Sequence, residues 1–345
     1  MRKLCALLGM AAVLVLLAAC GNKPTSAAKT VDFTTLDDLV AAAKKEGSVL
    51  LYTDMLPADT KRLQTVWGKT YPDIDLQIKT ISGTDLLTRF ESESESGAPS
   101  ADVVSSAQPD YYADASKRGL ITPLQETGVL KLVPNYPKKY LFDDLKTALI
   151  QAVPAGFIYN TKVVPADKAP RDWPDLLDPF WKGKVLSDDK DDTSDINALI
   201  TLARLRDAYG EKFLGQLRAQ LGPVQGGFQP MQAAVGAGEG AAAIQSLEFI
   251  VAGMQKEGAP VKFVPVSHSH WAVHGFGVSA KATRPAAARL LAQFLLTPEG
   301  SESVSSSIGE YGPYDQIPEK FVPVTLAEIE RVRKDAKQIL AAYKA

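Results

Sequence analysis

The chain has very little cysteine and a single long apolar run. Its two cysteines, Cys5 and Cys20, both lie near the amino terminus of a chain of 345 residues. Every residue beyond Cys20 is therefore excluded from disulfide bonding and from thiolate metal ligation. The apolar run, 4–19, is too short to span a membrane comfortably as a helix. The remaining chain must be stabilised by its hydrophobic core, and it is long enough for two lobes.

An excess of either charge is also missing. The 38 basic and 40 acidic residues give a formal net charge of −2. Without a basic patch, this balance argues against nucleic acid as a partner. Enzyme motifs are missing too: the sequence has no Gly-x-Ser-x-Gly elbow, no Gly-x-x-x-x-Gly-Lys-Ser phosphate loop and no His-Glu-x-x-His metal motif. We therefore expect a protein without catalytic residues or a cofactor, rather than an enzyme.

The amino terminus has the features of a secretory signal. Two basic residues precede the apolar run, and small residues end it at Leu17-Ala18-Ala19-Cys20. These last four residues resemble the bacterial lipobox, whose cysteine is lipidated; the alternative is an ordinary signal peptide with a chance cysteine. We expect 1–19 to be the signal peptide, Cys20 the lipidation site and 20–33 a lipidated flexible tether. The protein would then lie on the periplasmic or extracytoplasmic face of a membrane.

Strand-like segments alternate with helix-like segments in the first third of the chain. The strand-like segments are 48–52, 75–81 and 101–104. This alternation predicts an α/β fold, with a parallel or mixed sheet covered by helices. Ligands of such folds bind beyond the carboxyl ends of the strands, often against helix amino termini. Hydroxyl side chains follow these strand ends: Thr53, Ser82, Thr84, Ser105 and Ser106. Each of them could be a helix cap or a turn residue, but their common position favours a ligand cleft.

The second half of the chain adds polar and aromatic candidates. A glycine-containing turn and the end of a small-residue strand could offer hydrogen bonds to an anion. A zinc site needs three or four converging ligands. The three histidines, 268, 270 and 274, could converge only if the chain bends sharply, so we expect no metal site. The tyrosines could wall the cleft or lie in the core. The further ligand-binding candidates are Tyr159, Gln225, Gly226, Ser246, His270, Tyr311 and Tyr314.

The stretch 153–185 carries the most specific pattern. After an apolar strand and a Pro-rich connector it reads Trp173-Pro174-Asp175-Leu176-Leu177, Asp178-Pro179 and Trp181-Lys182-Gly183-Lys184. In order and spacing it resembles the entry to the second lobe of periplasmic solute-binding proteins of ABC importers. The similarity is to the ferric-iron/polyamine-like branch of extracellular solute-binding family 1. The segment 285–300, which ends in Thr297-Pro298-Glu299-Gly300, resembles the same family.

The resemblance implies a type II periplasmic-binding-protein fold, in which two α/β lobes are joined by a hinge and bind a ligand between them. The first lobe would comprise 34–152 plus 268–345, and the second 153–267. Hinge segments would lie near Gln151–Pro154 and Val266–His270. The implied protein is a monomeric, lipid-anchored substrate-binding protein that delivers a small solute to an inner-membrane ABC permease and its ATPase. A ligand-sensing subunit for a membrane receptor is the alternative; porphobilinogen deaminase, an enzyme of similar architecture, would need a reactive cysteine.

The ligand class is inferred from the residues that this chain has at the positions where ferric-iron members of the family have their iron ligands. Ferric members use adjacent tyrosines after the small-residue strand of the second lobe. This chain has Ser246-Leu247-Glu248-Phe249 there, and its adjacent Tyr111-Tyr112 lies in the first lobe. Hydroxyls, glycine amides and helix amino termini suit an organic anion better, such as a phosphonate, a sugar phosphate or a carboxylate. Ferric iron or an iron chelate is the alternative ligand.

Overall fold

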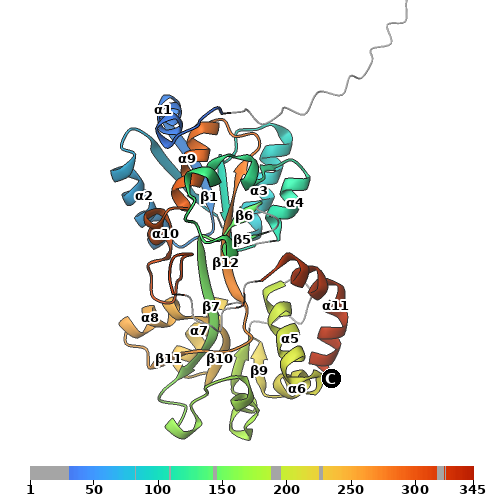
Figure 1. Cartoon of the computed structure of the whole chain (residues 1–345). Helices are drawn as coiled ribbons and strands as arrows, with labels where there is room; N and C mark the ends of the chain where they lie inside the picture. The colour runs from blue at the N-terminus through green and yellow to red at the C-terminus, as the bar shows by residue number, and fades with distance from the viewer. Residues whose placement is uncertain are drawn as a thin grey trace, which may run out of the picture.

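The chain folds into two lobes, one above the other in Figure 1. The computed structural model describes residues 31–81, 83–108, 110–142, 146–187, 196–224, 228–316, 322 and 324–345. One mixed sheet runs through both lobes in the strand order β2-β1-β3-β12-β7-β10-β8-β9, with β4 beside β12 and β11 beside β7. The predicted α/β class with two lobes is confirmed.

The first lobe, the upper one in Figure 1, is built on the β2-β1-β3-β12 part of the sheet. β1 runs parallel to β2 and β3, and β12 is antiparallel to β3. Its elements are α1 (Leu36–Glu46), β1 (Ser48–Thr53), α2 (Pro57–Thr70), β2 (Asp75–Thr80), α3 (Gly83–Ser96), β3 (Val103–Ser106), α4 (Tyr111–Lys117), β4 (Ile121–Thr122), η1 (Leu124–Glu126), η2 (Val129–Leu132), η3 (Lys138–Tyr140), β5 (Leu141–Phe142), β6 (Thr147–Ala148), β12 (Trp271–Ser279), α9 (Pro285–Leu295) and α10 (Pro298–Ser305).

Helices cover both faces of this part of the sheet. On one face, Trp67 of α2 and Phe294 of α9 belong to the larger core, with ring centroids 5.4 Å apart in an edge-on arrangement. On the other face, Phe90 of α3 and Tyr112 of α4 form a second core. Because β3 and most of β1 are buried, these two strands read as largely apolar runs in the sequence, whereas the edge strand β2 alternates. The layers therefore follow from the alternation seen in the sequence.

The second lobe surrounds the β7-β10-β8-β9 part of the sheet. β10 is antiparallel to β7 and parallel to β8. Its elements are β7 (Gln151–Asn160), η4 (Ala166–Lys168), η5 (Trp173–Leu177), η6 (Pro179–Trp181), β8 (Val185–Ser187), α5 (Ile196–Tyr209), α6 (Glu211–Arg218), β9 (Leu221–Val224), α7 (Phe228–Ala237), β10 (Ala242–Leu247), α8 (Glu248–Lys256), β11 (Val261–Pro265) and α11 (Leu326–Lys344).

The C-terminal helix α11 packs on the second lobe, so the expected assignment of 268–345 to the first lobe is wrong for this helix. Val332, Ile339 and Tyr343 are buried in the same core as Leu202 of α5 and Leu214 of α6. An apolar stripe on a helix must be covered by some partner. The chain satisfies this by crossing back to the second lobe before α11 begins.

Three chain segments connect the lobes. The first residues of β7 pair with the first residues of β12, from Gln151↔His274 to Pro154↔Trp271, and the rest of β7 pairs with β10 and β11. Tyr311 lies on the segment that leaves α10, and it exchanges two backbone hydrogen bonds with Ala152. The expected hinge segment Gln151–Pro154 thus lies where β7 passes from one lobe to the other.

Local sequence signals account for several helix starts. Thr35 and Asp38 form a reciprocal capping box on α1, and the Thr325 hydroxyl accepts a hydrogen bond from the backbone N–H of Glu328 on α11. Pro57, Pro285 and Pro298 occupy the first turns of α2, α9 and α10, where a missing N–H costs nothing. Within the described residues, no helix combines the length and the apolar character needed to cross a membrane.

Candidate functional site

The carboxyl ends of strands from both lobes meet at the gap between the lobes. In the first lobe, the last residue of β3, Ser106, pairs with Gly275, which is next to the crossing residue His274. In the second lobe, the last residue of β10, Leu247, pairs with Ala155 near the start of β7. Both ends are therefore adjacent to the crossing strands, which is the expected place for a ligand in an open α/β sheet.

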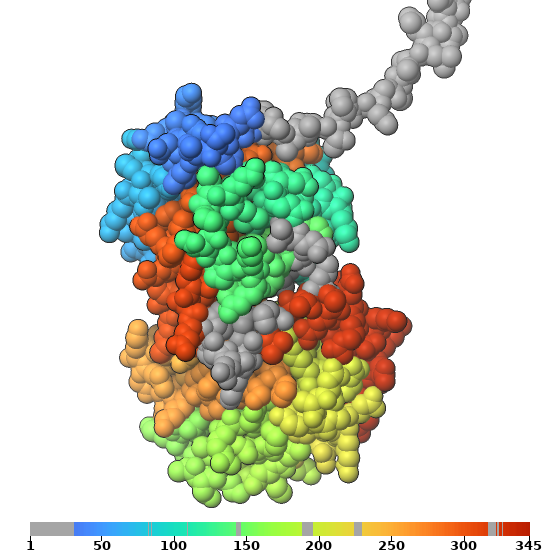
Figure 2. Space-filling view, in the orientation of Figure 1, coloured from blue at the N-terminus to red at the C-terminus, as the bar shows by residue number. Residues whose placement is uncertain are grey.

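One cavity in this region is lined by both lobes. Its volume is about 380 Å³, within the range of small-molecule pockets. In Figure 2, α11 (red) rises from the second lobe toward the first. The lining residues are Gln108, Asp110, Tyr111, Ala113, Asp114 and Lys117 of the first lobe and Ile329, Glu330 and Arg333 of α11. The Gln108 side chain lies near Gly83, the first residue of α3. This end of the cavity is therefore next to the carboxyl ends of the first-lobe strands.

Three of the five first-lobe hydroxyl candidates, Thr53, Ser105 and Ser106, lie on neighbouring strands, but they bond within their own lobe. Thr53 pairs with Ser105 across β1 and β3. The Thr53 hydroxyl accepts from the backbone N–H of Met55 at 3.1 Å, and the Ser105 hydroxyl donates to the carbonyl of Gly275 at 2.8 Å. Both side chains are fully buried, as is Ser106. In this structure they stabilise turns and strand ends, which is the alternative that the sequence left open.

Asp54 and His274 are functional candidates that the sequence analysis missed. His274 Nε2 lies 3.0 Å from Asp54 Oδ1, and the Ser106 hydroxyl donates to Asp54 Oδ2 at 2.8 Å. Burial by itself would raise the pKa of the Asp54 carboxyl, but its hydrogen bonds with His274 and Ser106 outweigh burial and hold that pKa below the usual value. The position of Asp54, directly after the first strand, was the available signal.

The second-lobe edge presents a carboxylate. Ser246 is fully buried and donates to Gln232 Oε1 at 2.8 Å. Glu248 follows at the start of α8, where burial raises the pKa of its carboxyl above the usual value. Burial and the nearby Glu248 carboxylate also raise the pKa of the Tyr311 hydroxyl. The Glu248 side chain lies against Gly309, so it is close to the third crossing segment.

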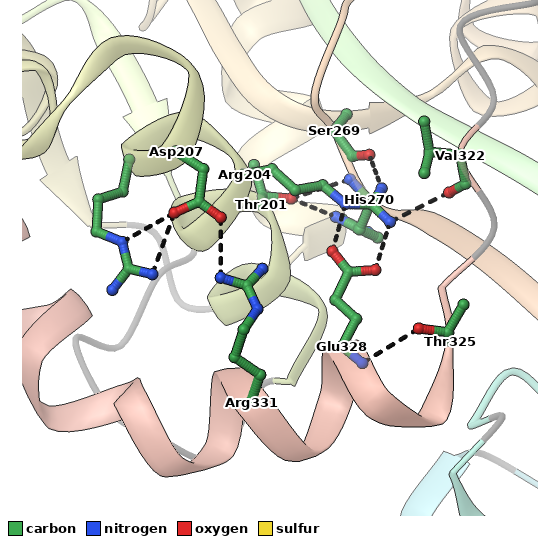
Figure 3. A network of polar contacts seen from close by, with 10 residues as sticks. Thr201, Arg204, Asp207, Ser269, His270, Val322, Thr325, Glu328 and Arg331 are labelled. Atoms are coloured by element: carbon green, nitrogen blue, oxygen red, sulfur yellow. Dashed lines mark hydrogen bonds and ion pairs between the residues drawn. The ribbon is translucent and has the colours of Figure 1, made fainter.

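His270 and Tyr311 lie at the crossings, whereas the other two candidate tyrosines do not face the gap. His270 is buried, with Nδ1 3.0 Å from the Thr201 hydroxyl (Figure 3). The Tyr311 ring packs on Trp271 at 5.8 Å. The Tyr314 hydroxyl donates to the carbonyl of Leu296, which ties it to the first-lobe core.

The structure does not place Tyr159 in the cleft, where the sequence analysis expected it. It pairs with Ala242, the first residue of β10, and it packs against the second-lobe core. Since the crossing end of β7 is its beginning, Tyr159 near the end of that strand lies at the far side of the lobe.

Several predicted residues cannot be placed. Cys20, Ser82, Gln225 and Gly226 lie outside the described residues, and so does the side chain of Thr84, although its backbone belongs to α3. In the part of the chain that the structure describes, no group of three or more His, Cys, Asp or Glu side chains could hold a metal ion.

Comparison with known proteins identifies the family. A family model described as bacterial extracellular solute-binding protein matches residues 27–302. No curated protein matches the chain by sequence. Solved structures of similar fold include the following three. Iron-bound HitA from Pseudomonas aeruginosa has a TM-score of 0.63 and 19% identity, over 86% of this chain and 98% of that one. AfuA from Actinobacillus pleuropneumoniae, with exogenous fructose-6-phosphate bound, has a TM-score of 0.63 and 17% identity, over 86% and 98%. The substrate-binding protein of an ABC transporter from Agrobacterium tumefaciens has a TM-score of 0.67 and 15% identity, over 88% and 97%.

The family model matches most of the chain, and the two-lobe fold with its opposed strand ends is consistent with that family. The chain belongs to the family of bacterial extracellular solute-binding proteins.

Proposed function

We propose that this chain is the lipid-anchored, monomeric substrate-binding protein of an ABC importer, and that it captures a small organic anion between its lobes. The observation that carries the proposal is the opposition of strand ends across the gap. Helices α2 and α3 of the first lobe and α8 of the second begin at these ends. Helix amino termini favour negative charge because their first N–H groups have no partner within the helix.

The two carboxylates at this edge narrow the ligand class. Asp54 already accepts hydrogen bonds from His274 and Ser106, so its charge is held inside the first lobe. Glu248 accepts hydrogen bonds when ionised and suits a ligand hydroxyl. A sugar phosphate combines an anionic group with several hydroxyls. The fructose-6-phosphate bound to AfuA is a ligand of this kind.

Ferric iron is the second candidate, because HitA is equally similar in fold and is iron-bound. The described residues favour the anion. Tyr111 and Tyr112 pack edge-on at 5.7 Å as neighbours in the first lobe, and both are buried. At the position of the ferric members' tyrosine pair, this chain has Ser246 and Glu248 instead.

A ligand screen tests the proposal. At a hundredfold excess over its dissociation constant, a sugar phosphate should raise the free energy of unfolding by about 2.7 kcal/mol, because it binds only the folded state. Thermal shift and calorimetry would compare fructose 6-phosphate, citrate, spermidine and ferric citrate. Small-angle scattering should show a smaller radius of gyration with the bound ligand, since hinge-type lobes close on it. Tight ferric binding with no response to organic anions would contradict the anion class.

Lipid anchoring is tested separately. Because Leu17-Ala18-Ala19-Cys20 resembles a lipobox, Cys20→Ala should leave the protein unprocessed or release it from membranes. Cells that lipidate their own lipoproteins would be labelled with a clickable fatty acid. Label on the wild type and none on Cys20→Ala is the expected result, and an unlabelled wild type rules the anchor out.

A further inference from the structure

The C-terminal helix contacts both lobes. Its first turns are fixed to α5 of the second lobe, since Glu328 pairs with Arg204 at 2.8 Å and Arg331 pairs with Asp207 at 2.9 Å (Figure 3). Two residues after Arg331, the guanidinium of Arg333 pairs with the carboxylate of Asp110 at the start of α4 in the first lobe. Neighbouring arginines on one helix thus make one contact within a lobe and one between lobes.

The interlobe pair lies in the wall of the cavity that both lobes line. Asp110 and Arg333 are both lining residues, and α4 and α11 face each other at the right of Figure 1, beside the crossing strands. Rotation of the lobes about the crossing strands would widen this cavity and separate the two charges. The Asp110 side chain makes no capping hydrogen bond to α4. A cap hydrogen bond on that helix therefore does not account for a carboxylate at this position.

We propose that Arg333 and Asp110 form a clasp, an ion pair between the lobes that favours the closed arrangement, in which the two lobes are close together. A contact made in only one of two conformations shifts the population toward that conformation by its differential free energy. The Arg333 side chain is 62% exposed and that of Asp110 is 16% exposed, so the clasp is a surface ion pair. Losing such a pair should raise the ratio of open to closed molecules by about two- to five-fold at low salt.

The clasp has a consequence that rests on the proposed function. A solute between the lobes leaves when they open, so a weaker clasp should speed its release. The clasp itself is a property of the ligand-free chain. It can therefore be tested without knowing the solute, and its failure is distinguishable from failure of the proposed function.

The test measures the interlobe distance distribution of the ligand-free full chain. Spin labels would be placed at Lys45→Cys on α1 and Lys212→Cys on α6, both exposed positions, with the native cysteines Cys5 and Cys20 replaced by serine. Arg333→Ala and Asp110→Asn should both move the distribution toward longer distances. Arg331→Ala is the matched control, since it removes an exposed arginine of the same helix whose partner lies in the same lobe.

Two further arms distinguish a charge pair from a general loosening of α11. The double exchange Arg333→Asp with Asp110→Arg should restore the wild-type distribution. Sodium chloride at 1 M, where the screening length falls to about 3 Å, should bring the wild type to the Arg333→Ala distribution. An unchanged distribution in Arg333→Ala, or an equal change in Arg331→Ala, overturns the clasp.

Discussion

Replacing Asp102 by alanine is expected to lower the free energy of unfolding by about 3–5 kcal/mol. Asp102 is fully buried. One carboxylate oxygen accepts from the backbone N–H groups of Thr283 and Arg284, at 3.0 and 3.1 Å. The other accepts from the N–H of Leu50 at 2.9 Å and lies 2.7 Å from the guanidinium of Arg284. Alanine would leave three backbone donors without their acceptor beside a buried side chain, and it would remove the carboxylate partner of the guanidinium, which is 22% exposed.

The position of Asp102 explains why the loss should be large. The residue joins the first strand, through Leu50, to the segment that enters α9, and its own carbonyl accepts from Ser279 at the end of β12. The carboxylate, which alanine removes, is shared by the first strand and the segment before α9. Each backbone donor left unpaired in the interior costs about 1–3 kcal/mol. Urea denaturation followed by circular dichroism would measure the effect.

Two variants calibrate the Asp102 measurement. Asp102→Asn retains one acceptor oxygen and should lose less stability than alanine. Asp73→Ala removes a carboxylate that is 64% exposed and pairs with Lys44, so it should change the free energy of unfolding by less than about 1 kcal/mol. If Asp102→Ala and Asp73→Ala lower the free energy of unfolding by similar amounts, the buried carboxylate does not stabilise the contact between the first strand and the segment before α9.

The secondary structure could be predicted from the sequence because its signals are local. Thr35 and Asp38, three residues apart, form the capping box expected at the start of the first helix. Thr325 likewise caps the last helix. The lobe that the last helix joins is a different matter. Its buried residues Val332 and Ile339 show only that one face must be covered, and the same stripe would fit either lobe.

The sequence predicted where the strand-end hydroxyls Thr53 and Ser105 lie, but not which groups they bond. The sequence placed Thr53 and Ser105 at strand ends, and the structure pairs them. The bonding of a hydroxyl, however, depends on which distant strand lies beside it. Ser105 donates to Gly275, 170 positions away, and Asp54 meets His274, 220 positions away. Neither partner follows from local pattern, since the antiparallel insertion of β12 beside β3 creates both contacts.

Replacing Arg204 by alanine is the second change with a large expected effect. Its guanidinium donates to both carboxylate oxygens of Glu328 at 2.8 Å, to the carbonyl of Ser269 at 3.0 Å and to that of Val322 at 3.1 Å (Figure 3). These partners belong to α11 and to two of the segments that connect the lobes. The Arg204 and Glu328 side chains are only 10% and 16% exposed. Removal of one partner from such a pair should cost about 3 kcal/mol, because the other charge stays buried.

The pattern of variants at this pair distinguishes charge from packing. Arg204→Lys keeps the charge but loses the planar fork that bonds both oxygens, so it should recover only part of the loss. Arg204→Met with Glu328→Leu removes both charges and fills similar volume, and it should be more stable than Arg204→Ala alone. Arg331→Ala, whose partner Asp207 is 46% exposed, should cost less than about 1 kcal/mol.

Hydrogen exchange would locate the effect of Arg204→Ala in the fold. The amides of α11 should lose protection in this variant while those of α9 in the first lobe keep theirs, because Arg204 joins α11 to α5 and to the crossing segments near Ser269. A loose α11 should also release the clasp, so the interlobe distances of Arg204→Ala should shift in the same direction as those of Arg333→Ala. Equal loss of protection in both lobes would instead mean that Arg204 stabilises the whole molecule, and its assignment to α11 would be wrong.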